Sequence, residues 1–128
     1  MAESNAETLL ESGFAEAEKT LNDPDEMERF LQRLEEKLKI VPVAGGVLSN
    51  IPVFISMIRS YINKEYSDIP LGTIIAIISA LLYFLSPLDA IPDGIPVFGY
   101  ADDAAVIIAC LNLVQSDVDE YKAWRGSK

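Results

Sequence analysis

Four aspartates in the second half of the chain are the residues best suited to chemistry. Asp89 and Asp93 lie four positions apart, and Asp102 and Asp103 are adjacent. Carboxylate oxygens are preferred ligands of hard cations such as calcium and magnesium, and paired carboxylates can serve as acid and base in hydrolysis. However, Asp102 and Asp103 precede an expected helix, where carboxylates accept hydrogen bonds from unpaired N–H groups. Capping is the preferred interpretation, a divalent-cation site the second and a hydrolytic site the third.

The composition offers few other groups for catalysis or metal binding. The sequence contains no histidine and one cysteine, Cys110, which lies in an apolar run and is expected to be buried and inert. We therefore expect no enzymatic activity, no catalytic residues and no cofactor, with calcium or magnesium at the aspartates as the alternative. Ten Lys plus Arg against twenty Asp plus Glu give a net charge of −10, which argues against nucleic acid as a partner.

Two apolar helices must position these aspartates. Residues 69–88 carry no charge and approach the roughly 20 residues that a bilayer-spanning helix needs. Small side chains interrupt this apolar surface at Gly72, Ala76 and Ala80, and such a helix-packing stripe is expected to face another helix. The uncharged stretch of the following helix, residues 104–116, is shorter than a usual span. Together the two helices predict an apolar hairpin.

The connection between the two helices is rich in proline and aspartate. No regular helix is expected to continue through its three prolines, so residues 83–103 are interpreted as a structured turn. A tyrosine begins an ordered pattern of prolines and aspartates, followed by glycine and two adjacent aspartates. Its positions are Tyr83, Pro87, Asp89, Pro92, Asp93, Pro96, Gly99, Asp102 and Asp103. This pattern resembles the YkvA family of small proteins, and the resemblance covers about residues 51–114.

The resemblance implies membrane association but no particular reaction. The family has no agreed biochemical activity, and its members are described as membrane-associated because of their hydropathy. Related domains occur in membrane-bound ubiquitin ligases, but a zinc-binding RING needs many Cys and His residues, which this chain lacks. Ligase activity is therefore not implied.

The first 41 residues are expected to form two acidic amphipathic helices. The first covers residues 5–21, although Gly13 weakens it. The second begins at Pro24, because Asp23 can cap it and proline suits the first helical position. A third helix is expected over about residues 51–64.

The fold class follows from these periodic segments. Each long segment fits the helical repeat of about 3.6 residues, which predicts an all-α fold. The expected architecture is a small bundle of about five helices built on the apolar hairpin. The length suits one hydrophobic core, so residues 1–128 are expected to form a single domain, with residues 51–123 as its hairpin core.

Two functions fit this architecture. In the preferred one, the protein is non-enzymatic, associates with a membrane through its hairpin and acts through protein or lipid contacts. It is expected on the cytoplasmic side, because basic residues lie outside both ends of the hairpin, in agreement with the positive-inside rule. In the alternative, a soluble cytoplasmic interaction module buries residues 70–86 on all sides. Both functions are compatible with a homo-oligomer. The acidic N-terminus does not resemble a signal peptide, so secretion is not expected.

Overall fold

The computed structural model describes residues 10–39, 47–90 and 96–126, with side chains placed except at 47–48, 86–90 and 96–104. In these ranges the chain is helical and contains no strand, so the all-α prediction is confirmed. The elements are α2 (Phe14–Leu21), α3 (Pro24–Leu38), the 3₁₀ helix η1 (Val47–Asn50), α4 (Ile51–Ile62), α5 (Leu71–Ala90) and α6 (Pro96–Gly126).

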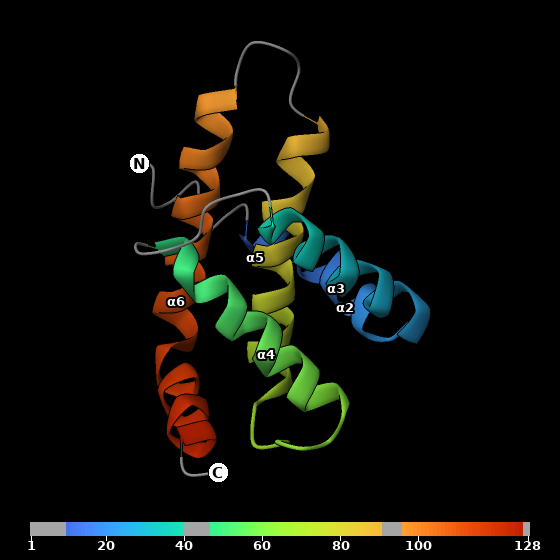
Figure 1. Ribbon diagram of the computed structural model, residues 1–128, viewed down its shortest axis with the longest axis vertical. Coiled ribbons are helices and arrows are strands. Elements are labelled where there is room, and N and C mark those ends of the chain that lie inside the picture. The colour runs from blue at the N-terminus through green and yellow to red at the C-terminus, as the bar shows by residue number, and fades with distance from the viewer. Residues whose placement is uncertain (1–9, 40–46, 91–95, 127–128) are drawn as a thin grey trace.

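The acidic helices α2 and α3 pack side by side (Figure 1). The predicted start of α3 is confirmed: Oδ1 of Asp23 accepts hydrogen bonds from the backbone N–H groups of Asp25 and Glu26, at 3.1 and 3.2 Å. Proline at the first position of α3 loses no helical hydrogen bond. The first predicted helix is interrupted, because a turn at Gly13 separates a short helical stretch, residues 10–12, from α2.

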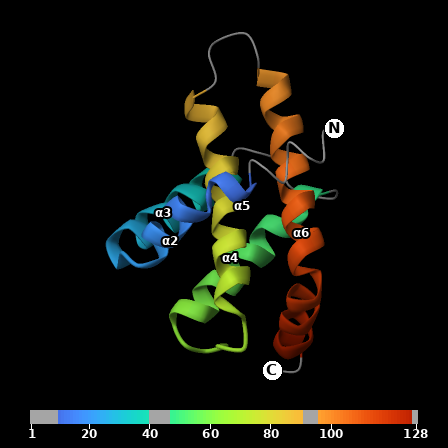
Figure 2. The ribbon, with the colours of Figure 1, turned by 180° about the vertical axis from the view of Figure 1, so that it is seen from behind.

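Helix α5 is central to the bundle, since α2, α3, α4 and α6 all contact it (Figures 1 and 2). Its apolar side chains fill the space between these helices. The completely buried ones are Ile74, Ile77, Ile78, Leu81 and Phe84. A helix that is apolar on nearly all sides is stable in water only when neighbours cover it, and here four neighbours do so. Within the described residues, no helix combines the length and sustained apolarity that crossing a bilayer requires.

The prediction that no helix continues through Pro87 is wrong, because α5 runs on to Ala90. Proline removes one N–H donor, but packing of a helix against its neighbours can outweigh that loss. One contact of this kind lies in the turn before Pro87. Buried Lys37 of α3 donates a hydrogen bond from Nζ to the carbonyl oxygen of Phe84, and Nζ lies 3.8 Å from the centroid of the Phe84 ring. The regular helix α6 then begins at Pro96, where the missing N–H costs nothing.

Candidate functional site

Three of the four aspartates of the candidate cation site lie on the helices α5 and α6 of the hairpin. Asp89 belongs to the last turn of α5, and Asp93 lies outside the described residues. Asp102 and Asp103 are inside α6, beyond its first turn. The prediction that they cap this helix is therefore wrong, because the unpaired N–H groups belong to the turn that begins at Pro96. The side chains of all four aspartates are outside the described set, and the cation site stays a prediction.

The other motif residues follow the same hairpin. Tyr83 is partly buried in α5, and Pro87 lies in the last turns of that helix. Pro92 is outside the described residues, while Pro96 and Gly99 belong to the first turn of α6. Among the side chains that are described, no three His, Cys, Asp or Glu residues lie close enough together to share a metal ion.

The small-residue stripe is divided between a buried part and an exposed end. Ala76 and Ala80 are 4% and 1% exposed. They share a helix face with Thr73, whose hydroxyl donates a 2.6 Å hydrogen bond to the Asp117 carboxylate, so this face packs toward α6. Gly72 differs, because it is exposed and no atom lies within 4 Å of the position that its Cβ would occupy. Gly72 therefore takes no part in close helix packing.

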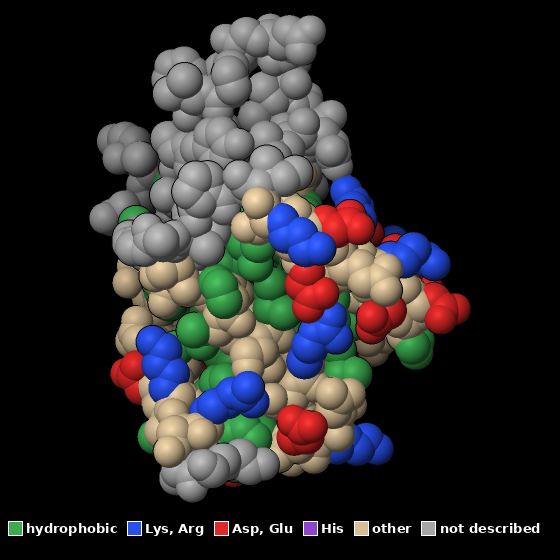
Figure 3. Space-filling view, in the orientation of Figure 1, with side chains coloured by type: hydrophobic (Ala, Val, Ile, Leu, Met, Phe, Trp, Pro, Cys, Tyr) green, Lys and Arg blue, Asp and Glu red, His purple; other side chains and the backbone are tan. Residues whose placement is uncertain are grey.

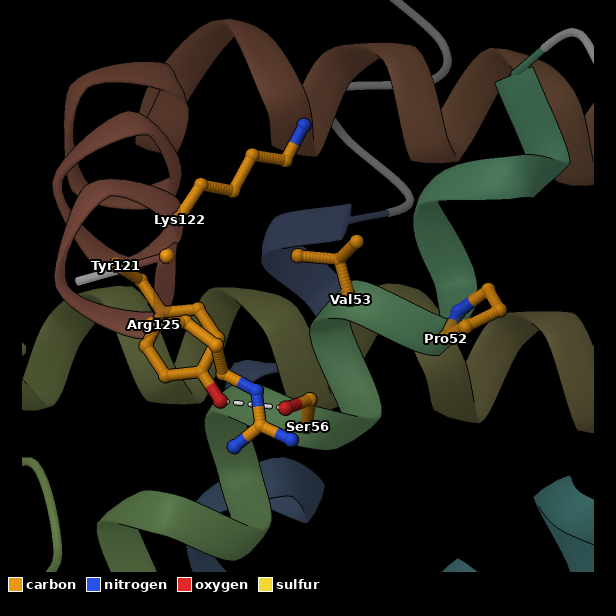
Figure 4. A pocket seen from close by; sticks show the side chains of 7 residues that line it. Pro52, Val53, Ser56, Tyr121, Lys122 and Arg125 are labelled. Atoms are coloured by element: carbon orange, nitrogen blue, oxygen red, sulfur yellow. Dashed lines mark hydrogen bonds between the residues drawn. The ribbon is translucent and has the colours of Figure 1, made fainter. Parts of the chain in front are cut away.

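A pocket of about 430 Å³ lies between the beginning of α4 and the end of α6 (Figure 4). Its walls combine apolar groups, hydroxyls and two cations. The lining residues are Pro52, Val53 and Ser56 from α4 and Tyr121, Lys122, Arg125 and Gly126 from α6. Figure 3 shows basic side chains next to apolar surface over this part of the two helices. Its described lining contains no Asp or Glu side chain, although the sequence has twenty of them.

A hydroxyl network fixes the inner wall of the pocket. The hydroxyl of Tyr121 shares hydrogen bonds with Oγ of Ser56 and, at 3.0 Å, with Oγ of Ser60. The two serines lie four residues apart and so face the same side of α4. Tyr121 and Ser60 are buried, whereas Ser56 is partly accessible from the pocket. The network joins α4 to α6 and leaves the Ser56 hydroxyl at the pocket surface.

An aromatic cluster lies behind this wall. The ring centroid of Tyr121 is 5.4 Å from that of Tyr66 and 5.7 Å from that of Trp124, and Tyr66 and Trp124 are 4.7 Å apart. Burial raises the pKa of Tyr66, and the negative charges of Glu120, Asp68 and Asp117 raise it further. The neutral phenol is thus the favoured form, and the cluster holds the last turns of α6 against the loop before α5.

The two cations at the pocket differ from two arginines of α3 and α4, which are ion-paired. Arg29 pairs with Glu26, and Arg59 pairs with Glu35 at 2.8 Å. By contrast, the exposed side chains of Lys122 and Arg125 have no ion-pair partner within the part of the chain that the structure describes. The amino-acid sequence alone did not indicate this site. The spacing of the two serines on α4 can be read from the sequence, but the hydrogen bond between Ser56 and a tyrosine 65 residues away cannot.

Comparison with known proteins identifies the family. The chain is 35% identical over 78 residues to the uncharacterized membrane protein YkvA of Bacillus subtilis (strain 168), and the match covers 61% of this chain and 74% of that relative. The chain belongs to the YkvA family. The family model described as a protein of unknown function (DUF1232) matches residues 73–109. No solved structure matches the chain.

The match to the DUF1232 model coincides with the hairpin rather than with the pocket. Residues 73–109 run from the first turn of α5 to the middle of α6 and include every position of the Pro/Asp pattern. The pocket residues on α4 and on the last turns of α6 all lie outside this range. The hairpin is thus what the family model captures, and the pocket is formed by flanking parts of the chain.

Proposed function

We propose that this protein is a non-enzymatic, membrane-associated helical protein that acts through contacts with lipids or with another protein. Its relative from Bacillus subtilis is named a membrane protein, and the two share 35% identity over most of that relative's length. The proposal places membrane contact at the hairpin that the family model matches.

The arrangement of the helices supports this placement. The last turns of α5 and the first turns of α6 extend together beyond α3 and α4 in both views (Figures 1 and 2). The sequence of this end is largely apolar, with Leu88, Val97 and Phe98 among its residues. The middle of α5, in contrast, is already covered by four helices. The hairpin end can therefore insert into a membrane while α2, α3 and α4 stay outside it, and the bundle does not need to unfold. The extension of α5 and α6 beyond the other helices is the observation that carries the proposal.

Flotation with lipid vesicles tests membrane association directly. The purified full chain is mixed with phosphatidylcholine vesicles, which are chosen because the net charge of −10 would oppose binding to anionic ones. We expect the protein to float with the vesicles. The double variant Val97→Asp, Phe98→Asp should bind about tenfold more weakly or not at all, because charged side chains enter a bilayer at high cost.

Leu113→Asp is the matched control for this experiment. Leu113 also lies on α6 but is 60% exposed on the body of the helix, away from the hairpin end. This variant should float like the wild type. A wild-type protein that stays with the soluble fraction would overturn membrane association. Equal losses in the hairpin variant and in Leu113→Asp would overturn the hairpin as the site of contact.

The alternative function is a soluble interaction module, and the closed packing around α5 favours it. The four neighbouring helices bury the apolar side chains of α5 without help from lipid. If this function is correct, the protein should remain monodisperse in buffer without detergent and should not float with vesicles. Carbonate extraction of cell membranes separates the two proposals in vivo, since only an inserted hairpin would resist it.

A further inference from the structure

We propose that the pocket between α4 and α6 binds an anionic amphiphile, with its phosphate or carboxylate head held by Arg125 and Ser56, its apolar chain lying on Pro52 and Val53, and Lys122 adding positive charge from the other end of the pocket. This inference concerns a part of the molecule outside the hairpin and does not depend on membrane insertion. It rests on the composition of the pocket wall and on how its side chains are directed.

The polar half of the pocket is suited to an anionic head group. In Figure 4 the guanidinium group of Arg125 lies toward the hydroxyl pair of Ser56 and Tyr121, while Lys122 is directed to the other end of the pocket. A guanidinium group can donate two parallel hydrogen bonds to a phosphate or carboxylate, and a serine hydroxyl can donate a third. Because Ser56 is held by Tyr121, its hydroxyl is already positioned before a ligand arrives.

Electrostatics favour an anion here in spite of the acidic composition. Among the residues that the structure describes, the pocket lining has two positive charges and no Asp or Glu. The carbonyl end of α6 also lies at this pocket and contributes about half a negative charge, which two full positive charges outweigh. Over most of the remaining surface, an anion would meet the excess of ten acidic residues that the sequence carries. The pocket is therefore a local site of favourable potential for an anion.

The apolar half of the pocket explains why an amphiphile is inferred rather than a free anion. Pro52 and Val53 form its apolar wall. A free phosphate would use only the polar groups and would leave this apolar surface exposed to water. An attached alkyl chain would bury it, at a gain of about 0.8 kcal/mol for each fully buried methylene group.

Tryptophan fluorescence provides the test, because Trp124 is the single tryptophan of the sequence. Its ring lies 5.7 Å from that of Tyr121, which lines the pocket. The full chain is titrated with dihexanoyl phosphatidic acid below the concentration at which that lipid forms micelles, with calorimetry as a second readout. We expect saturable binding at one site. Inorganic phosphate and dihexanoyl phosphatidylcholine should each bind at least about tenfold more weakly, since one lacks the chain and the other lacks the net negative head.

Variants assign the binding to the pocket. Arg125→Gln should weaken binding of dihexanoyl phosphatidic acid by about tenfold, and Lys122→Gln should weaken it less, because Lys122 lies at the other end of the pocket. Val53→Ser should weaken it without changing the affinity for inorganic phosphate. Lys19→Gln is the matched control, because Lys19 is an exposed cation of α2 remote from the pocket lining. The absence of saturable binding in both readouts would overturn the proposal. So would equal losses in Arg125→Gln and Lys19→Gln, or phosphate binding as tight as that of the lipid.

Discussion

Ser79 of α5 donates a 2.5 Å hydrogen bond to the backbone carbonyl oxygen of Leu10, which lies 69 residues earlier in the chain. The bond is buried and is possible only because Gly13, next to the same serine, has no side chain. A Cβ atom at Gly13 would overlap Oγ of Ser79. This contact fixes the N-terminal segment against the central helix.

We therefore expect Gly13→Ala to lower the free energy of unfolding by about 1–3 kcal/mol, because the methyl group would displace Ser79 and break its hydrogen bond. The control is Gly72→Ala, at an exposed position of α5 where a Cβ meets no atom within 4 Å. That change should be neutral or stabilising by up to about 1 kcal/mol, because alanine favours helix. Urea unfolding followed by circular dichroism measures both. A harmless Gly13→Ala would contradict the close approach.

The second prediction concerns the buried part of the small-residue stripe. Ala76→Leu should destabilise the protein by about 1–3 kcal/mol, because the larger side chain would push α6 away from α5. Ile77→Leu is the control, since it nearly conserves volume at a neighbouring position that is completely buried. Thermal unfolding compares the two variants. Equally small effects from both would show that Ala76 does not lie at a tight interface.

The third prediction is that a substitution of Lys64 stabilises the protein. Its φ of 62° lies in the left-handed region, directly after the end of α4, and Glu65 N–H bonds the Ser60 carbonyl oxygen at 2.9 Å. Glycine is preferred at this position of a helix C-terminus, so Lys64→Gly should stabilise the protein by about 0.5–1 kcal/mol.

Lys39→Gly is the control for this effect, because Lys39 follows α3 with an ordinary φ of −71°. Glycine there adds flexibility to the unfolded chain without relieving strain, and it should be neutral or destabilising by up to about 1 kcal/mol. Chemical unfolding of both variants in the same buffer gives the comparison. Loss of stability in Lys64→Gly would mean that the left-handed conformation of Lys64 imposes no cost.

The fourth prediction is an alkaline loss of stability caused by Cys110. Burial raises the pKa of this thiol from 9.0 to about 12, because the thiolate is poorly solvated in the core. The folded state therefore keeps its proton at pH values where the unfolded state loses it. The contribution of the protonated thiol to the free energy of unfolding is fully present below about pH 9. It is lost as pH rises toward 12, and the free energy of unfolding then falls by up to about 1.4 kcal/mol per pH unit.

The measurement for Cys110 is the difference in unfolding free energy between the wild type and Cys110→Ala. Tyrosine and lysine titrations are common to both proteins and cancel in this difference. The alanine variant has a constant packing loss but lacks the thiol titration, so the difference should shrink between pH 9 and the highest pH at which the protein is folded. A difference that does not change with pH would contradict burial of the thiol.

Features that depend only on residues close together in the sequence could be predicted from the sequence. The start of α3 is an example, because Asp23 needs only the N–H groups of the next turn to act as a cap. The all-α class followed in the same way from helical periodicity. The family resemblance depended on an ordered local pattern, and the comparison with the Bacillus subtilis relative confirmed it.

Features that depend on helix packing were decided only by the tertiary structure. Proline was expected to end α5, yet the helix continues past Pro87 where α3 supports the preceding turn through Lys37. Two glycines that look alike in sequence differ completely, because Gly13 touches Ser79 and Gly72 faces open space. The pairing of Ser56 with Tyr121 joins residues 65 positions apart. Local sequence sets helical propensity and apolar faces, but the relative placement of the helices determines which side chains meet, and with it the pocket between α4 and α6.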